Sequence, residues 1–229
     1  MFLGWLAPNG QYVLSSSSVE LSNTQLTAQW EQVNITGDYT SYLAVATSSY
    51  RNTGIYAANR YSSASAVYVD WGDGAVEKIN GNISKLAHTY SANGNYTVKV
   101  SNNITSFAPS YNDSTWYNTT SHSRYTFKDI MKVGSRLTSI PSYAFYYCSA
   151  LSSINWLSSF SSMTQIPSYC FYYCSSIPSL SALSSTSFRS TSTYSFQYCT
   201  GLKNLAGIER FTSFGSNTFY YCQGLSSID

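Results

Sequence analysis

A tetrapeptide that begins with Phe and ends with Cys recurs four times in the second half of this chain. The copies lie at residues 145–148, 171–174, 196–199 and 219–222, and a Leu or Ile follows each cysteine three residues later. Their cysteines are 26, 25 and 23 residues apart, which is the period of one coil of a solenoid. One unit of this length cannot bury its own apolar face, but stacked units bury a continuous interior and leave an extended outer surface.

The composition supports folding and excludes some partners. Hydrophobic residues make up 43% of the 229 residues, which is enough for packed cores, whereas only 10% are charged and 22 are tyrosines. A net charge of +2 without a basic cluster gives no electrostatic footprint for nucleic acid. No apolar run approaches the length of a bilayer crossing, so we expect neither a nucleic-acid partner nor a membrane span. Residues 1–7 lack the features of a signal peptide, so we expect either another export route or a missing beginning.

The five cysteines predict a ladder of thiols and not a disulfide framework, because their number is odd and four of them occupy equivalent repeat positions. Equivalent side chains of stacked coils recur at about the strand spacing of 4.8 Å. We therefore expect Cys148, Cys174, Cys199 and Cys222 to line the interior as reduced, small hydrophobic side chains. Cys170 and Cys174 have a loose metal-ligand spacing, but no histidine lies within the repeats to complete a zinc site. We expect no metal and no cofactor.

Residues 1–33 predict a short antiparallel β segment. Asn9-Gly10 is typical of a hairpin turn, and residues 26–30 alternate in polarity as a strand does. Residues 2–5 and 25–30 resemble the second half of the internalin-type B repeat, also called the Listeria-Bacteroides repeat. The family's first strand is absent, so the resemblance implies a partial β-grasp-like segment that is either clipped or borrows a partner strand.

Residues 34–108 predict an all-β sandwich. Alternating β-forming residues flank the Trp-Gly-Asp-Gly turn at residues 71–74, and a second strand pattern follows between His88 and Val100. The order and spacing of Trp-Gly-Asp-Gly and of His-Thr-Tyr-x-x-x-Gly-x-Tyr-x-Val resemble the PKD domain. That resemblance implies an immunoglobulin-like β-sandwich of the kind found in extracellular proteins.

Three side chains near this turn have two interpretations. Asp70 and Asp73 carry the hard oxygen atoms that Ca²⁺ prefers, but aspartate in such a turn usually accepts backbone N–H bonds. We favour the second role, with Trp71 filling the core. His88 is a ligand or a base in one interpretation, but the PKD resemblance implies packing near the Trp71 turn, which we favour.

The remaining chain divides into a linker or loop at residues 109–129 and a solenoid at residues 130–229. Pairs of Leu or Ile after each cysteine predict a short inward-facing strand per coil, and Pro141 and Pro167 predict a brief helical turn that inserts the following Phe into the interior. The repeat resembles the BspA-like leucine-rich repeat unit, Ile-Pro-x-x-Ala-Phe-x-x-Cys-x-x-Leu-x-x-Ile. Cys170 replaces Ala and Gln197 replaces the first Tyr of the tetrapeptide.

The tyrosines inside the repeated tetrapeptides are the candidate ligand-binding residues. If the Phe and Cys of each coil point inward, one of the aromatic residues between them should face outward, giving a row of phenol rings. Tyrosine offers rigid contact area with a hydrogen-bonding tip, as binding surfaces use repeatedly. The alternative is that the rings only cover the outside of the stack. The candidates are Tyr146, Tyr147, Tyr172, Tyr173, Tyr198, Tyr220 and Tyr221.

The pattern predicts no enzyme. The two histidines lie far apart, and the chain has no Gly-rich phosphate loop and no Gly-x-Ser-x-Gly elbow. The three family resemblances imply an extracellular, non-catalytic protein that binds an extracellular protein or a glycan, as part of a bacterial cell-surface adhesin. A virion protein of a tailed phage and a spacer without a ligand are the alternatives. We also expect a homo-oligomer, a larger assembly or further repeats to cover the last coil.

Overall fold

The structure is a computed structural model of the whole chain. It describes residues 2–6, 12–13, 27–30, 35–58, 66–79, 83–101, 104–109 and 123–226. The chain divides into two compact units, Met1–Ile35 and Thr36–Asp229. The prediction of a mainly β chain is confirmed, because strands make up most of the regular secondary structure of the described residues and helices are few and short. Within the described residues, no helix is long and apolar enough to span a membrane.

The first unit holds a three-stranded antiparallel sheet in the order β2-β1-β3. Strand β1 (Phe2–Leu6) lies between β2 (Tyr12–Val13) and β3 (Thr27–Trp30). Trp5 is paired with Val13 on one side and with Ala28 on the other. Antiparallel pairing in this segment agrees with the sequence, whereas its likeness to a B repeat stays a prediction.

The second unit begins with two antiparallel sheets. The larger sheet has the strand order β11-β4-β9-β6-β7, and the smaller sheet has the order β10-β5-β8. The strands of the larger sheet are β4 (Tyr39–Ala46), β6 (Val67–Asp70), β7 (Val76–Ile79), β9 (Gly94–Ser101) and β11 (Phe127–Lys132). The strands of the smaller sheet are β5 (Asn52–Ala58), β8 (Ile83–Thr89) and β10 (Ser106–Ala108).

The two sheets share one core. Along β6, Val67 and Val69 are buried whereas Tyr68 and Asp70 are half-exposed, so one face of the strand points inward. The Tyr42 hydroxyl of β4 lies 3.2 Å from the Thr53 hydroxyl of β5, and the Tyr42 ring lies 5.7 Å from the ring of Phe107 in β10. The sheets therefore face each other across buried aromatic side chains. The immunoglobulin-like topology expected from the sequence stays a prediction.

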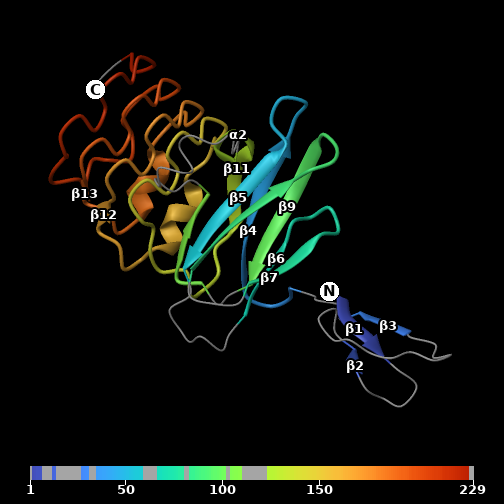
Figure 1. Cartoon of the computed structure of the whole chain (residues 1–229). Helices are drawn as coiled ribbons and strands as arrows, with labels where there is room; N and C mark the ends of the chain where they lie inside the picture. The colour runs from blue at the N-terminus through green and yellow to red at the C-terminus, as the bar shows by residue number, and fades with distance from the viewer. Residues whose placement is uncertain are drawn as a thin grey trace. The chain divides into compact units, whose positions relative to one another are not determined.

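Strand β11 joins the sheets to the solenoid. It follows the short helix α2 (Ser123–Thr126) and pairs with β4 in the larger sheet. The strand crosses residue 130, where the sequence analysis begins the solenoid, so residues 127–132 belong to the sheet. After β11 the chain winds into the coils drawn from yellow to red in Figure 1.

The solenoid contains little extended backbone. Strands β12 (Gln165–Ile166) and β13 (Ser190–Thr191) pair in parallel, and parallel bridges join Ser106 to Ser139 and Ser190 to Ser213. These segments lie just before the Phe of each coil. The predicted strand at the Leu and Ile pairs after each cysteine is therefore wrong in the described coils.

The reason for this error is the interval within each pair. Leu151 and Ile154, like Ile177 and Leu180, are three residues apart, which fits an i to i+3 turn better than the period of a strand. All four side chains are buried as predicted. The 3-10 helices η1 (Asn155–Ser159) and η2 (Ser181–Ser185) follow directly. The last pair includes Ile228, which lies outside the described residues.

Candidate functional site

A regular hydrogen-bond pattern holds the Phe-containing segment of each coil. In the first coil the N–H groups of Tyr143, Phe145 and Tyr147 donate to carbonyl oxygens of the next coil, at 3.1, 2.9 and 2.7 Å. The N–H groups between them donate to the carbonyl three residues earlier in the same coil. The segment is thus a run of turns and not the helical turn that the prolines predict. Because the next two coils repeat this pattern, equivalent side chains of neighbouring coils lie in register.

Each described coil contains two residues with positive φ, four positions apart. Seven of these eight residues are tyrosines, although a positive φ is uncommon for residues other than glycine and asparagine. Left-handed backbone costs an L-residue about 1–2 kcal/mol. The hydrogen bonds between coils hold the backbone in this shape. The eight residues are Tyr143, Tyr147, Tyr169, Tyr173, Tyr194, Tyr198, Asn217 and Tyr221, with φ between 55° and 63°.

The phenylalanines form a continuous column inside the stack. Phe145 stacks on Phe171 at 5.4 Å between ring centroids, Phe171 stacks on Phe196 at 5.1 Å, and Phe196 stacks on Phe219 at 5.9 Å. The first three rings are at most 1% exposed, whereas Phe219 in the last described coil is half-buried. The predicted insertion of Phe into the interior is confirmed.

The predicted thiol ladder is also confirmed, because all five cysteines are free and buried. The Sγ atoms of Cys174, Cys199 and Cys222 each donate to the carbonyl oxygen of the Phe in the preceding coil, at 3.1 Å. Burial raises the pKa of Cys170, Cys174 and Cys199 well above the usual value, and it raises the pKa of Cys222 to about 11. These four thiols are therefore protonated at neutral pH, and all five cysteines serve as small interior side chains.

The tyrosines next to this interior form the tyrosine surface, which consists of three rows along the stack. Their rings contact one another between coils, with near-parallel pairs at centroid distances of 4.6 to 4.8 Å. The first row is Tyr143, Tyr169 and Tyr194. The second row begins with Tyr146 and Tyr172, and Tyr220 occupies the same position in the last described coil. The third row is Tyr147, Tyr173, Tyr198 and Tyr221.

All seven predicted site residues lie on this surface, but their exposure differs from the expectation of one outward ring per coil. In the first two coils both tyrosines of the tetrapeptide are at least partly exposed. In the third coil Gln197 is buried, which interrupts the second row. Tyr173, Tyr220 and Tyr221 are the most exposed, at 39%, 51% and 47%. Their contact with a ligand stays a prediction.

The first row was not among the residues predicted from the sequence. Tyr143 and Tyr169 stand in the Pro-Ser-Tyr segments that precede each Phe, and Tyr194 has the same position in the third coil. The recurrence of these segments was a usable signal, because it places a tyrosine at a fixed distance before each Phe. Burial raises the pKa of Tyr169, with further increases from the neighbouring Tyr143 and Tyr194. The Tyr169 phenol therefore presents a neutral hydroxyl group at neutral pH.

Stacking determines what this surface offers to a ligand. Where rings lie face to face between coils, their faces contact other tyrosines, and the parts of these side chains that remain exposed are available to a ligand. Such exposed parts suit hydrogen bonding and van der Waals contact over a broad, uncharged area. No Lys, Arg, Asp or Glu lies within the repeated segments 143–148, 169–174, 194–199 and 217–222.

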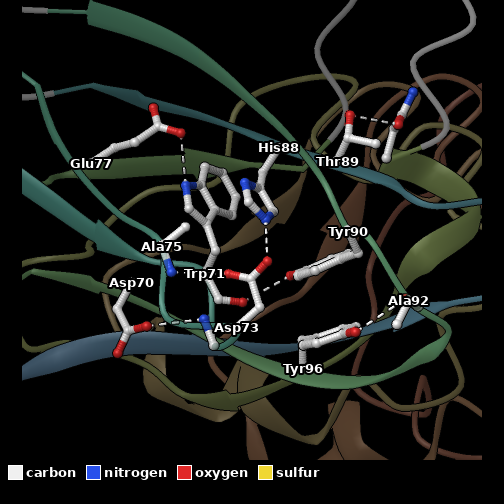
Figure 2. A network of polar contacts seen from close by, with 12 residues as sticks. Asp70, Trp71, Asp73, Ala75, Glu77, His88, Thr89, Tyr90, Ala92 and Tyr96 are labelled. Atoms are coloured by element: carbon white, nitrogen blue, oxygen red, sulfur yellow. Dashed lines mark hydrogen bonds and ion pairs between the residues drawn. The ribbon is translucent and has the colours of Figure 1, made fainter.

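A second polar network surrounds Trp71 in the turn between β6 and β7 (Figure 2). The Trp71 indole is fully buried, donates from Nε1 to Glu77 at 2.9 Å, and stacks on the His88 ring at 5.1 Å. The Tyr90 hydroxyl donates to the Trp71 carbonyl at 3.0 Å. The favoured structural role of His88 beside Trp71 agrees with this packing.

The two aspartates of the turn bind backbone N–H groups. Asp70 accepts from Gly72 N at 2.9 Å, and Asp73 accepts from Ala75 N at 3.1 Å. Asp73 also lies 2.7 Å from His88 Nε2. Burial alone would raise the pKa of Asp73, but the hydrogen bonds from His88 and Ala75 lower it overall. Among the described residues, no three His, Cys, Asp or Glu side chains gather as ligands of a metal ion would.

The stacked coils with inward Phe, Cys and Leu side chains define the chain's second half as a leucine-rich-repeat solenoid. Comparison with protein families agrees, because residues 112–229 match the BspA type leucine rich repeat region in six copies. The match covers more than half of the chain, which therefore belongs to this family. Proteins of the family are typically surface-associated and bind ligands. No curated protein and no solved structure matches the chain.

Proposed function

We propose that this chain is a non-catalytic binding module displayed outside cells, in a bacterial cell-surface adhesin, and that its tyrosine surface contacts an extracellular protein or a glycan. The family supports surface display and ligand binding in general. The PKD-like and B-repeat-like patterns of the sequence support a modular extracellular protein. The virion alternative has no support from the family match and stays a hypothesis.

The observation that carries this proposal is the choice of tyrosine at the left-handed positions. Glycine or asparagine would adopt this backbone more easily, and Asn217 shows that the fold accepts asparagine there. Tyrosine nevertheless occupies the other seven positions. Strain that is retained at a partly exposed side chain suggests a role for that side chain. Ring stacking is one reason for tyrosine at these positions, and we propose contact with a ligand as the other.

The chemistry of the candidate nucleophiles supports a non-catalytic role. Burial and a raised pKa keep the thiols of Cys174 and Cys199 protonated, whereas a nucleophilic cysteine needs its thiolate form. The Asp73–His88 pair is short, but the His88 ring is stacked on Trp71 and Asp73 also fixes the turn through Ala75 N. These two groups have structural partners that explain their positions.

Binding assays on the intact chain test the proposal. The wild-type chain and the double variant Tyr172→Ala, Tyr173→Ala are compared on arrays of glycans and of extracellular proteins. We expect the variant to lose at least about tenfold in affinity for the ligand that the wild type selects, because a hot-spot aromatic contributes about 2 kcal/mol or more. Tyr172→Phe with Tyr173→Phe keeps the rings and removes only the hydroxyl groups.

A matched control separates binding from folding. Tyr50→Ala removes an exposed tyrosine, 36% accessible, that lies outside the solenoid and stacks on Tyr125. Thermal unfolding of each variant shows whether the coils remain folded. If the folded alanine double variant binds every probe as the wild type does, the tyrosine surface is not the binding site.

A further inference from the structure

The rows of the tyrosine surface bring phenol rings of neighbouring coils into direct contact. In the first row the ring centroids of Tyr143 and Tyr169 are 4.6 Å apart, and those of Tyr169 and Tyr194 are 4.7 Å apart. In the third row the Tyr147 and Tyr173 centroids are also 4.7 Å apart. Each contact joins residues that lie one coil apart in the sequence, so the rows place oxidisable rings of separate coils next to one another.

Backbone hydrogen bonds fix which rings meet. The N–H group of Tyr169 donates to the Thr193 carbonyl at 3.1 Å, and the N–H group of Tyr173 donates to the Gln197 carbonyl at 2.8 Å. In both cases the tyrosine in the next coil that the ring contacts directly follows the accepting residue. Groups held together in this way have an effective concentration far above that of a second chain in a dilute solution. Reaction within one chain is therefore favoured over reaction between chains.

The phenols of these rows are accessible to an oxidant, whereas the thiols are not. Every tyrosine of the three rows is at least partly exposed. All five cysteines are free and buried in the interior. Because oxidation of a cysteine depends on its exposure and its thiolate form, the buried thiols compete poorly for a reagent that arrives from solvent. The free cysteines also leave the coils without a disulfide that would link one coil to another.

We propose that the tyrosine surface is a site of oxidative cross-linking, at which dityrosine bonds form between neighbouring coils. Each of two phenols loses one electron and its hydroxyl proton, and the two phenoxyl radicals join through the ring carbons beside the hydroxyl-bearing carbons. The hydrogens on the joined carbons then pass to the two oxygens, which restores both phenols. Hydrogen peroxide, acting through a haem peroxidase, accepts the two electrons and two protons and is reduced to two molecules of water.

The bond requires movement of the rings and leaves the coils in place. Stacked rings face each other, so they turn about their side-chain bonds until the reacting carbons meet, as partly exposed side chains do rapidly. The product closes a loop of one coil, and such a covalent link restricts the unfolded chain as a disulfide does. Cross-linking therefore stabilises the solenoid, and it does so whether or not the tyrosine surface binds a ligand.

Peptide mapping of the intact chain after treatment with hydrogen peroxide and a haem peroxidase tests this proposal. Trypsin cleaves after Arg136, Arg189 and Lys203, which places the second and third coils in the separate peptides 137–189 and 190–203. We expect mass spectrometry to find these two peptides joined, with the loss of two hydrogen atoms, in chains that keep the mass of a monomer. Tenfold dilution of the protein should leave the yield per chain unchanged, because the reaction is intramolecular.

Two variants locate the bond. Tyr194→Phe with Tyr198→Phe keeps both rings of the third coil and removes their hydroxyl groups, so the joined peptides should decrease at least about tenfold. Tyr50→Phe, outside the solenoid, is the matched control and should leave their yield unchanged.

The cross-linked wild-type chain should also unfold at a Tm higher by at least about 4 °C than the untreated chain. Joined peptides at the wild-type level in the phenylalanine double variant would overturn the proposal. So would cross-links that occur only between chains, or oxidised monomers in which peptides 137–189 and 190–203 stay separate.

Discussion

A tyrosine such as Tyr173 combines two opposing contributions to stability at the scale of one residue. Its left-handed backbone costs about 1–2 kcal/mol, whereas its ring stacks on Tyr147 at 4.7 Å and contacts the tilted ring of Tyr198 in the next coil at 5.7 Å. Aromatic pairs contribute about 0.5–1.5 kcal/mol beyond area burial. The two effects are of similar size, so ring contacts within the row can offset the cost of the left-handed backbone.

The buried cysteines give a prediction about reactivity at this scale. We expect the native chain to react negligibly with a thiol reagent at pH 8, because burial blocks access to all five cysteines and raises the pKa of thiols such as Cys174 and Cys199. As the pH rises toward 11, Cys222 reacts first, since its pKa is about 11 and it is 8% exposed. Mass spectrometry of alkylated peptides identifies the residue. Rapid labelling of Cys174 in folded protein at pH 8 would contradict a closed interior.

At the scale of single elements, glycine allows a turn to approach neighbouring backbone closely. Gly207 has a φ of +104°, and a Cβ there would overlap the carbonyl oxygen of Leu180 in the preceding coil. Gly74, in the turn after Trp71, has a similar φ of +97° but no atom within 4 Å of a Cβ. Both positions therefore have a backbone conformation that would strain a residue with a Cβ, and they differ only in how closely other atoms pack around that Cβ.

This contrast predicts the effects of two alanine variants. Gly74→Ala should lower the free energy of unfolding by about 1–2 kcal/mol, because only the left-handed backbone is strained. Gly207→Ala should lower it by about 1–3 kcal/mol more, because the coils must also separate. Urea denaturation followed by circular dichroism measures both. Equal losses in the two variants would show that the coils separate without cost.

In a second element, the turn that contains Trp71, we expect the contribution of Asp73 to the free energy of unfolding to depend on pH. Asp73→Asn should lower the free energy of unfolding by about 1–2 kcal/mol at pH 7, since it weakens hydrogen bonds to a charged group. The folded-state pKa of Asp73 is lowered, so its stabilisation is present above pH 3.8 and is lost as the pH falls through the folded-state pKa. Wild type and variant should therefore converge in stability toward pH 2. A constant difference from pH 7 to pH 2 would contradict this role of the Asp73 charge.

Some features of the coils could be predicted from the sequence and others could not, and the difference has physical reasons. Recurrence identified the coils, the inward Phe and Cys side chains and seven tyrosines of the surface, because equivalent positions of a stack have equivalent environments. The predicted strand of each coil was misplaced. Its apolar residues are three positions apart, whereas the side chains on one face of a strand recur every two residues. The left-handed tyrosines could not be predicted from propensity, since tyrosine is not a residue that favours positive φ. Their backbone is set by hydrogen bonds to the next coil.

At the scale of the second unit, a single side chain links the two sheets to the solenoid. Phe127, on strand β11, is fully buried and contacts Tyr42 at 5.0 Å, Phe107 at 6.3 Å and Phe145 at 5.6 Å between ring centroids. These rings belong to the larger sheet, the smaller sheet and the first coil. Their shared core implies that sheets and solenoid stabilise one another, as neighbouring repeats of a stack do.

This shared core predicts that the sheets and the first coil unfold together. Phe127→Ala should lower the free energy of unfolding by about 3–5 kcal/mol, because it removes a buried ring and leaves a cavity at the junction. Hydrogen exchange should then accelerate in both β4 and residues 143–148, and not in one of them alone. Met131→Ala on the same strand is the control, since Met131 is 61% exposed and should change stability by about 0.5 kcal/mol or less. Faster exchange confined to the sheets would show that the solenoid is stable without them, and the end of β11 would then mark a boundary between independently folding domains.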